Sequence, residues 1–335
     1  MRNIFAPVAA AVLLLGGAAV AGPPQYSQIA SWSAPDAGWD YASVDAQARR
    51  LYVGRFGGVL MVDLSSGKLT PVLIGSRLVH GVAPLPNGDA AASNGEDNTV
   101  TIFDGASGSL RSTIRVGAGP DSITFEPRHG WVAVTDEDGE AVSLVDPRKG
   151  ALVGTIKLGG SPEAVTADGR GRLYDNIDSR AEIAVLDAGK RAVVRRIKLP
   201  GCDHPTGIAY DAVRQLVVSA CRNGVVSVVR AGDSRVATTL KVGAGPDTVM
   251  IDSKRGVAFV PSGLKGELNV IALDADGGAH VVQVVPTEVG TRTGAVDPVS
   301  GDVYLPAATL APSHDPKQPH TLVPGTFKIL VYAPG

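Results

Sequence analysis

The chain contains 335 residues, and its 31 basic and 33 acidic side chains give a formal net charge of −2 at pH 7. A chain so close to neutral carries no broad positive field, which argues against nucleic acid as its partner. Only 19% of the residues are charged and glycine occurs 41 times, a composition that favours short packed strands joined by tight turns. A local basic cluster at Arg191, Arg195, Arg196 and Lys198 is expected on a solvated strand face.

Residues 1–21 have the pattern of a secretory signal peptide. Arg2 precedes an uncharged run, residues 7–21, which consists mostly of Ala, Val and Leu and ends in Ala19, Val20 and Ala21. Small residues at this place are typical of a cleavage site. An uncleaved anchor is the alternative, but the run is shorter than the ~20 apolar residues of a membrane-spanning helix. We therefore expect residues 22–335 to form a single exported domain, periplasmic or secreted, without a membrane span.

From residue 38 onward, one short β pattern repeats along the whole chain. Each repeat begins with an apolar strand that ends at a polar residue or a proline. These end positions are separated by about 40–45 residues, which is the period of a four-stranded propeller blade. The seven end positions are Asp45, Pro86, Glu126, Asp168, Asp211, Asp252 and Asp297.

The third strand of each repeat is the most regular element. Residues 59–63, 100–104 and 142–146 are rich in β-branched and aliphatic side chains, as buried strands require. Each of these segments ends in Asp, whose carboxylate can accept hydrogen bonds from the following backbone and start the turn to strand four. We therefore expect these aspartates to be structural rather than catalytic.

The ends of the chain indicate how the repeats close. The last repeat ends near residue 333 without a fourth strand, and an orphan strand, residues 26–32, precedes the first repeat. Pairing the orphan strand with the last repeat removes the open sheet edges that invite aggregation. The sequence thus predicts an all-β fold, a seven-bladed β-propeller of four-stranded antiparallel blades in which the N-terminal strand completes the last blade. An open solenoid is the alternative, but it would need capping units, and none is evident.

The second strands carry a family signature. It reads Arg50-Leu51-Tyr52-Val53-Gly54 in the first repeat, and weaker forms occur at residues 172–174 and 303–305. With these strands the chain resembles the YVTN family of bacterial β-propeller repeat proteins over essentially all of its length after residue 21. Similar propellers occur in amine dehydrogenase heavy subunits and in nitrous oxide reductase. The resemblance implies the fold and says little about activity.

Cys202 and Cys221 are the only cysteines. In an exported protein, pairing is the default. Cys202 directly precedes the strand expected at 206–211, and Cys221 ends the strand expected at 215–220. Because the start of one antiparallel strand faces the end of its neighbour, the two thiols are predicted to form a disulfide. A redox-active pair is the alternative, but the sequence contains no Cys-x-x-Cys.

The starts of the inner strands are candidate binding positions, because they surround the mouth of the central channel. This mouth lies on the face that also carries the loops between blades and between the second and third strands, here called the top face. Carboxylates gathered there would suit a hard cation such as Ca²⁺. The alternative is that they are turn elements repeated by duplication. The residues five positions before each strand end are Asp40, Gly81, Asp121, Glu163, Thr206, Asp247 and Arg292.

Histidines give a second set of candidates. His80 and His204 precede inner strands on the top face, and His314 and His320 lie in a long insertion of the last repeat, residues 307–326. Imidazole nitrogens bind Zn²⁺ or Cu²⁺. A solvated, proline-rich loop with incidental histidines is the alternative. Two acidic loops, 94–98 and 136–140, are expected to be tight turns, with a weak Ca²⁺ site between them as the alternative.

Several catalytic signatures are missing from the sequence. There is no Cys-x-x-Cys-His, so we expect no covalent haem, and neither a Gly-x-Ser-x-Gly elbow nor a phosphate-binding loop occurs. We therefore expect a monomeric, non-catalytic scaffold that binds a small molecule, a divalent metal (Ca²⁺ or Zn²⁺) or a periplasmic protein on its top face. The alternatives are a metal-assisted, lactonase-like hydrolase and a redox-partner subunit of an amine dehydrogenase-like system.

Overall fold

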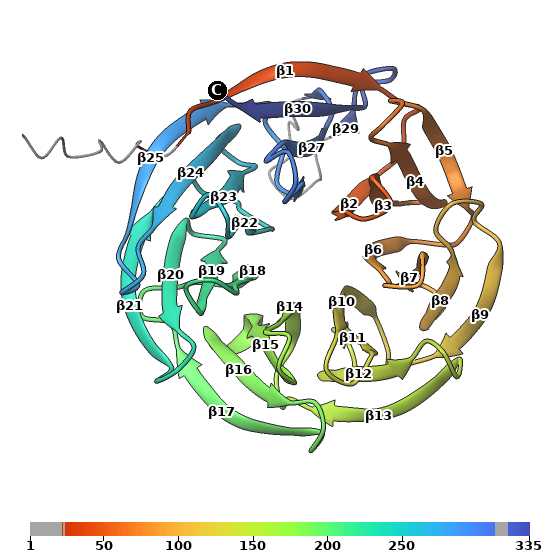
Figure 1. The fold of residues 1–335 in the computed structure, drawn as a ribbon, viewed down its shortest axis with the longest axis horizontal. Coiled ribbons are helices and arrows are strands. Elements are labelled where there is room, and N and C mark those ends of the chain that lie inside the picture. Colours follow the sequence, from red (N-terminus) through yellow and green to blue (C-terminus); the bar gives the residue numbers. More distant parts are fainter. Residues whose placement is uncertain (1–21, 23, 312–320) are drawn as a thin grey trace, which may run out of the picture.

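The computed structural model describes residue 22 and residues 24–311 and 321–335. Within these ranges the chain forms seven four-stranded antiparallel sheets, arranged radially in a ring (Figure 1). A single short 3₁₀ helix, Asp178–Arg180, and a two-stranded ribbon of β28 (Leu310–Ala311) and β29 (Thr321–Leu322) accompany them in the described part. The predicted seven-bladed propeller is confirmed. The predicted signal peptide, residues 1–21, lies outside the described residues.

Blades 1 to 3 each consist of four strands that are consecutive in sequence and run from the channel outward. The first strand of each blade lies near the centre of the ring and the fourth forms its outer rim (Figure 1). The strands are β2 (Trp39–Asp45), β3 (Arg50–Arg55), β4 (Gly58–Asp63), β5 (Leu69–Ile74), β6 (Val79–Pro84), β7 (Asp89–Asn94), β8 (Thr99–Asp104), β9 (Leu110–Arg115), β10 (Pro120–Glu126), β11 (Trp131–Asp136), β12 (Ala141–Asp146) and β13 (Ala151–Lys157).

Blades 4 to 6 repeat this order, and the inner strand of blade 6 is the shortest of the three. The strands are β14 (Pro162–Ala167), β15 (Arg172–Ile177), β16 (Glu182–Asp187), β17 (Ala192–Lys198), β18 (Pro205–Asp211), β19 (Leu216–Cys221), β20 (Val225–Arg230), β21 (Arg235–Lys241), β22 (Met250–Asp252), β23 (Val257–Ser262), β24 (Glu267–Leu273) and β25 (Ala279–Pro286).

Blade 7 joins the two ends of the chain. Its strands are β26 (Ala295–Val296), β27 (Val303–Ala307), β30 (Lys328–Pro334) and, outermost, β1 (Tyr26–Ser33). Strands β1 and β30 pair antiparallel from Tyr26 opposite Pro334 to Ser33 opposite Lys328. They lie side by side at the top of Figure 1. The predicted closure by the N-terminal strand is confirmed.

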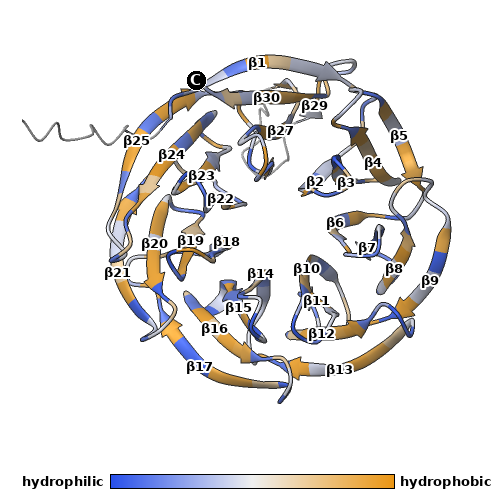
Figure 2. Ribbon diagram, viewed as in Figure 1, coloured by the Kyte–Doolittle hydropathy of each residue, from blue (hydrophilic) through white to orange (hydrophobic). Residues whose placement is uncertain are grey.

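The hydrophobic core lies between the blades. Ala133 and Leu144 of blade 3 form one buried cluster with Leu173 and Leu186 of blade 4, and similar clusters occur at other blade interfaces. The third strands β12 and β20 are almost wholly buried, whereas the outer strand β21 alternates exposed and half-buried residues. Figure 2 shows this gradient as largely hydrophobic third strands inside a rim of mixed hydropathy. Because neighbouring blades cover both faces of a third strand, its residues are apolar on both faces.

Carboxylates at strand ends organise the turns opposite the top face and also connect the blades. Asp252 accepts the backbone N–H of Arg255 and pairs with its guanidinium at 2.6 Å, and Arg255 Nη2 donates to the carbonyl oxygen of Ser300 in blade 7. Blade 7 is joined in turn to blade 1, because Arg49 Nη1 lies 2.5 Å from Asp297 Oδ2. The aspartates that end the third strands, such as Asp63, accept backbone N–H groups of their own turns, as expected.

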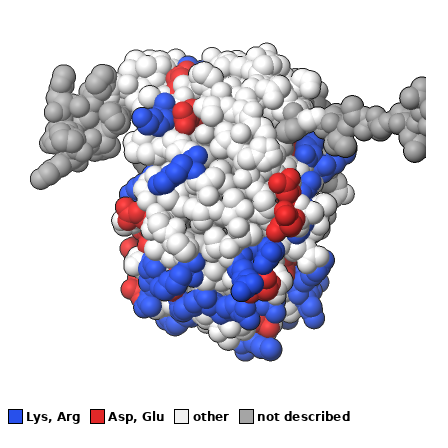
Figure 3. Space-filling view, turned by 90° about the vertical axis from the view of Figure 1, so that its left-hand side faces the viewer, with Lys and Arg blue, Asp and Glu red and all other residues white. Residues whose placement is uncertain are grey.

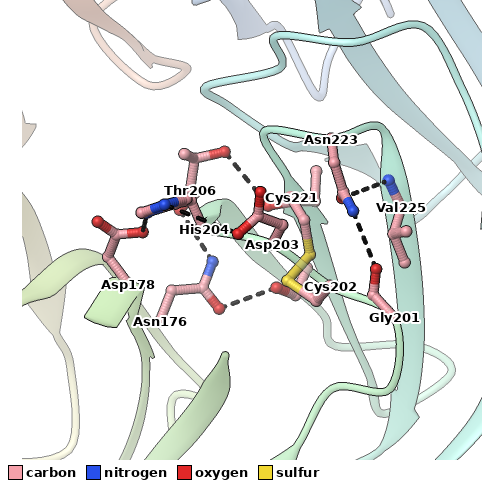
Figure 4. Close-up of a disulfide and its surroundings, with 12 residues drawn as sticks. Asn176, Asp178, Gly201, Cys202, Asp203, His204, Thr206, Cys221, Asn223 and Val225 are labelled. Carbon is pink, nitrogen blue, oxygen red and sulfur yellow. Dashed lines mark hydrogen bonds and ion pairs between the residues drawn. A yellow bond between two sulfur atoms is a disulfide. The ribbon is translucent and has the colours of Figure 1, made fainter. Parts of the chain in front are cut away.

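The disulfide prediction is also confirmed. Cys202 precedes β18, Cys221 ends β19, and their Cα atoms are 5.6 Å apart (Figure 4). Pro205 is the register partner of Cys221, so the bond ties the entry of blade 5 to its second strand on the top face. In the part of the chain that the structure describes, no helix has the length and hydrophobicity to cross a membrane.

Replacement of Tyr26 tests the closing strand. The Tyr26 ring is only 2% exposed and meets Phe259 edge-to-face with 4.8 Å between ring centroids. Tyr26→Ala should lower the free energy of unfolding by about 3–5 kcal/mol, because a buried aromatic side chain is removed. Ile29→Ala, at a 60% exposed position of the same strand, should change it by about 0.5 kcal/mol or less. Urea denaturation followed by circular dichroism measures both; equal effects would contradict the docking of β1.

Removal of the disulfide tests how much the Cys202–Cys221 bond contributes to stability. The Cys202→Ser, Cys221→Ser double variant should lose about 3 kcal/mol of stability, because a loop spanning 19 residues in sequence is no longer closed in the unfolded state. Reductant should destabilise the wild type by the same amount and leave the double variant unchanged. Urea midpoints that do not differ between oxidised wild type and variant would refute this.

Candidate functional site

A cavity of about 850 Å³ lies on the top face at the mouth of the channel. The starts of four inner strands and the segments that precede two others contribute to it, and so do loops between second and third strands. Six of the predicted positions line this cavity together: Asp40, His80, Asp121, Glu163, Asp247 and Arg292. The structure therefore brings most of the sequence candidates into one site.

A bulge at the start of the inner strands explains this convergence. The pairing register shifts between Trp39 and Ala42 in blade 1 and between Pro120 and Ile123 in blade 3. Blades 2, 4 and 5 have the same irregularity at the corresponding place. A bulge leaves one residue unpaired and redirects its side chain. In blades 1 to 4 this segment presents Asp40, His80, Asp121 and Glu163 to the cavity. Blade 5 has the bulge but its Thr206 does not line the cavity. Asp247 and Arg292 line it from segments that precede inner strands without a bulge.

Blade 2 departs from the acidic pattern for a steric reason. A Cβ atom at Gly81 would lie 2.8 Å from the Ile123 side chain of blade 3, so the position equivalent to Asp40 and Asp121 has no room for a carboxylate. His80, one residue earlier, occupies the cavity instead.

Asp40, His80 and Asp121 form the closest group in the site. His80 Nδ1 lies 2.6 Å from Asp40 Oδ2 and 3.2 Å from Asp121 Oδ1. One ligand atom from each of the three residues lies within 4.8 Å of the other two. Asp121 contacts His80 of the neighbouring blade. A carboxylate that served only to form a turn would not need this contact. One imidazole nitrogen and two carboxylate oxygens are thus placed where they could hold a metal ion.

The acidic side chains that line the cavity outnumber the basic ones, Arg222 and Arg292. Arg292 Nε lies 2.6 Å from Asp247 Oδ2. Burial, reinforced by the Asp247 and Glu137 carboxylates, raises the pKa of Glu163 to about 8. Burial, followed by the nearby Asp40, Glu163 and Asp247 charges, raises the pKa of Asp121 well above its usual value. A bound cation would relieve this repulsion.

Sequence reasoning missed part of the lining. Phe56, Glu137 and Arg222 each directly follow the second strand of their blade, and all three line the cavity. The repeat register applied to this position would have found them. Glu137 belongs to the acidic loop 136–140, which forms a turn as expected. Asp136 of this loop is buried and accepts a hydrogen bond from Ser143 Oγ at 2.7 Å, and Glu137 lines the cavity.

The other histidine candidates lie elsewhere. His204 is not among the residues that line the cavity; its Nδ1 lies 2.7 Å from Asp178 Oδ1, beside the disulfide (Figure 4). Thr206, at the blade 5 register position, is buried, and its hydroxyl donates to the carbonyl oxygen of Pro246. His314 and His320 lie outside the described residues.

The basic cluster of blade 4 is internally paired. Figure 3 shows Lys and Arg side chains toward the lower end of this side of the ring, with Asp and Glu among them. Arg196 Nη1 and Lys198 Nζ lie 2.5 and 2.8 Å from the Glu182 carboxylate. Arg195 Nη1 donates to the Asp233 carbonyl of the next blade. These contacts agree with the expectation of a solvated strand face.

Asp175 is a buried acid below the site. It lies on β15 between Leu173 and Ile177, on the face that packs against Ala133 of blade 3. The residue is 0% exposed, and neither carboxyl oxygen has a hydrogen-bond partner among the described residues. Burial, with a smaller contribution from Glu163, raises its pKa well above the usual value. Asp175 therefore keeps its proton to a higher pH in the folded protein than in the unfolded chain.

Comparison with known proteins supports the fold alone. No family model matches the sequence, and no curated protein matches it. Among solved structures, a chain of Kuenenia stuttgartiensis hydrazine synthase is similar, with a TM-score of 0.72 and 15% sequence identity. The alignment covers 87% of this chain and 95% of that chain. The likeness to the YVTN family remains a prediction.

Substitution of Asp175 should change how stability depends on pH. In the unfolded chain this carboxyl ionises near pH 3.9, whereas the folded protein retains the proton to a higher pH. The folded state therefore binds more protons above about pH 4, and stability falls as pH rises. Asp175→Asn should raise Tm at pH 8 and leave it unchanged near pH 3.5.

Asp211→Asn is the control for this experiment, because it breaks a buried ion pair with Arg214 at 3.1 Å. It should lower Tm at pH 8. Calorimetry at both pH values measures these shifts. A Tm for Asp175→Asn that is raised equally at pH 3.5 and pH 8 would contradict a buried, protonated Asp175.

Proposed function

We propose that this propeller is a binding scaffold that holds a divalent cation at the channel mouth through Asp40, His80 and Asp121. The observation that carries the proposal is the approach of three ligand atoms from three successive blades to within 4.8 Å of one another. Each residue sits on a different inner strand. The closed ring would therefore fix the spacing of the ligands before the cation binds.

The donor set favours Zn²⁺ over Ca²⁺. Ca²⁺ takes oxygen ligands and usually six to eight of them, whereas Zn²⁺ accepts imidazole nitrogen together with carboxylate oxygen. The carboxylates of Asp40 and Asp121 would balance the charge of a divalent ion. Three protein ligands would leave one position of a tetrahedral site for a further ligand.

We also propose that the protein is exported and belongs to the YVTN-repeat type. The disulfide between Cys202 and Cys221 supports an oxidising compartment, because such bonds are rare in the cytosol. The blade pattern and the second-strand signature support the repeat type. Binding, rather than turnover, agrees with the absence of a nucleophile motif in the sequence.

A metal-assisted hydrolase is a second candidate, and Glu163 is the observation that favours it. A carboxyl group with a pKa of about 8 in a cavity is suited to hold or accept a proton near neutral pH. This candidate requires turnover of a lactone or simple ester by the Zn²⁺-loaded protein, lost in Glu163→Gln. Unchanged turnover in that variant, or none in the wild type, would exclude it.

Metal titration tests the main proposal. The purified protein, stripped with chelator, should bind one Zn²⁺ by isothermal titration calorimetry and retain it through dialysis in elemental analysis. Asp121→Asn and His80→Gln each remove a direct ligand. They should weaken binding by about 100-fold or more, exceeding the 10–100-fold typical of groups that only support ligands.

His204→Gln is the matched control. This histidine also pairs with an aspartate on the top face, Asp178, but away from the cavity. Its replacement should leave Zn²⁺ affinity unchanged. Wild-type protein that binds no divalent ion, or an equal loss in His204→Gln and His80→Gln, would refute the site.

A further inference from the structure

We propose that the cation at Asp40, His80 and Asp121 recruits a small organic acid whose carboxylate completes the coordination sphere and whose apolar body lies against the apolar part of the cavity lining, Phe56, Leu264 and Val289. The inference rests on the proposed cation site and adds the class of ligand that it takes.

Polar and apolar side chains line the cavity together. Blades 2 to 4 supply only polar side chains to it, namely His80, Asp121, Glu137 and Glu163. Blades 1 and 6 and the segment between blades 6 and 7 add large apolar side chains, beside the charged side chains of Asp40, Asp247 and Arg292. The apolar lining includes Phe56, Leu264 and Val289, which are 59%, 65% and 50% exposed. Apolar side chains that line a concave site beside a few polar groups are typical of pockets for small molecules.

The size of the cavity agrees with such a ligand. About 850 Å³ lies within the range of roughly 300–1,000 Å³ that small-molecule sites occupy. An acid with an apolar chain offers a carboxylate to the cation and an apolar surface to Phe56, Leu264 and Val289. Burial of Leu264 and Phe56 against that chain would supply the affinity that a short acid lacks.

Charge explains why the loaded cavity would accept an anion. The cation offsets Asp40 and Asp121, and Arg292 offsets Asp247 through their 2.6 Å contact. The Arg222 guanidinium lines the same cavity and forms no hydrogen bond or ion pair with any residue that the structure describes. It therefore remains available to balance the nearby acids or to attract a carboxylate. Without the cation, the same cavity carries an excess of acid and would repel an anion.

Titration calorimetry with octanoate, acetate and octylamine tests the inference on the whole protein, with and without Zn²⁺. Octanoate should bind only the Zn²⁺-loaded form, and at least about tenfold more tightly than acetate. Leu264→Asn should weaken octanoate binding by about tenfold and leave Zn²⁺ affinity within twofold. Val213→Asn is the control, because Val213 is equally exposed but lies outside the cavity; it should alter neither.

The outcomes separate the two proposals. If the wild type binds no Zn²⁺, the cation site fails and the inference fails with it. If Zn²⁺ binds but octanoate does not, or octanoate binds equally without Zn²⁺ or to Leu264→Asn, only the inference is overturned. Octylamine that binds the metal-free protein and is lost in Leu264→Asn would also overturn it, in favour of an amphipathic cation.

Discussion

The pairing of β1 with β30 is the constraint on which the rest of the structure depends. It joins residues 26–33 to residues 328–334 and turns a row of seven similar sheets into a ring. Within a ring, the inner strands of blades that are far apart in sequence must converge. The Arg49–Asp297 pair on the opposite face reinforces the same junction between blades 1 and 7. An open row of blades would hold the same strands without a shared channel mouth, so the cavity exists only because the ends meet.

Because the inner strands converge, residues at equivalent positions of different blades come into contact with one another. The bulge at the start of the inner strands recurs in blades 1 to 5, and in blades 1 to 4 a side chain from this segment lines the cavity. Different residues at this position then meet one another: Asp40, Asp121 and Glu163 as acids, and His80 where Gly81 excludes a larger side chain. A second repeated position, directly after the second strand of a blade, contributes the loop residues Phe56, Glu137 and Arg222 to the same cavity. Equivalent positions of the repeats thus form an asymmetric site, because different residue types occupy them.

Electrostatic repulsion between the carboxylates of this site opposes folding and would favour the binding of a cation. The raised pKa values of Asp121 and Glu163 have burial and neighbouring carboxylates as their causes. The fold tolerates this repulsion because its stability comes from apolar clusters between blades, where strands such as β12 are buried on both faces. Asp175 differs from these carboxylates in its accessibility. Its carboxyl is buried in the interface of blades 3 and 4, which raises its pKa, whereas the cavity carboxylates remain within reach of a ligand.

The architecture could be predicted from the sequence. The repeat period, the closing strand at 26–32 and the Cys202–Cys221 pair all depend on local pattern and strand order, which are properties of the chain itself. The repeat register also placed Asp40, Asp121 and Glu163 at the channel mouth. The same register could not separate His80 from His204, because both lie near the start of an inner strand. Their difference depends on the packing of the blades, since His80 contacts two carboxylates from neighbouring blades while His204 pairs with Asp178. The apolar part of the cavity lining and Arg222 likewise became visible only in space, because side chains on loops of different blades are brought together by ring closure and not by any spacing in the sequence.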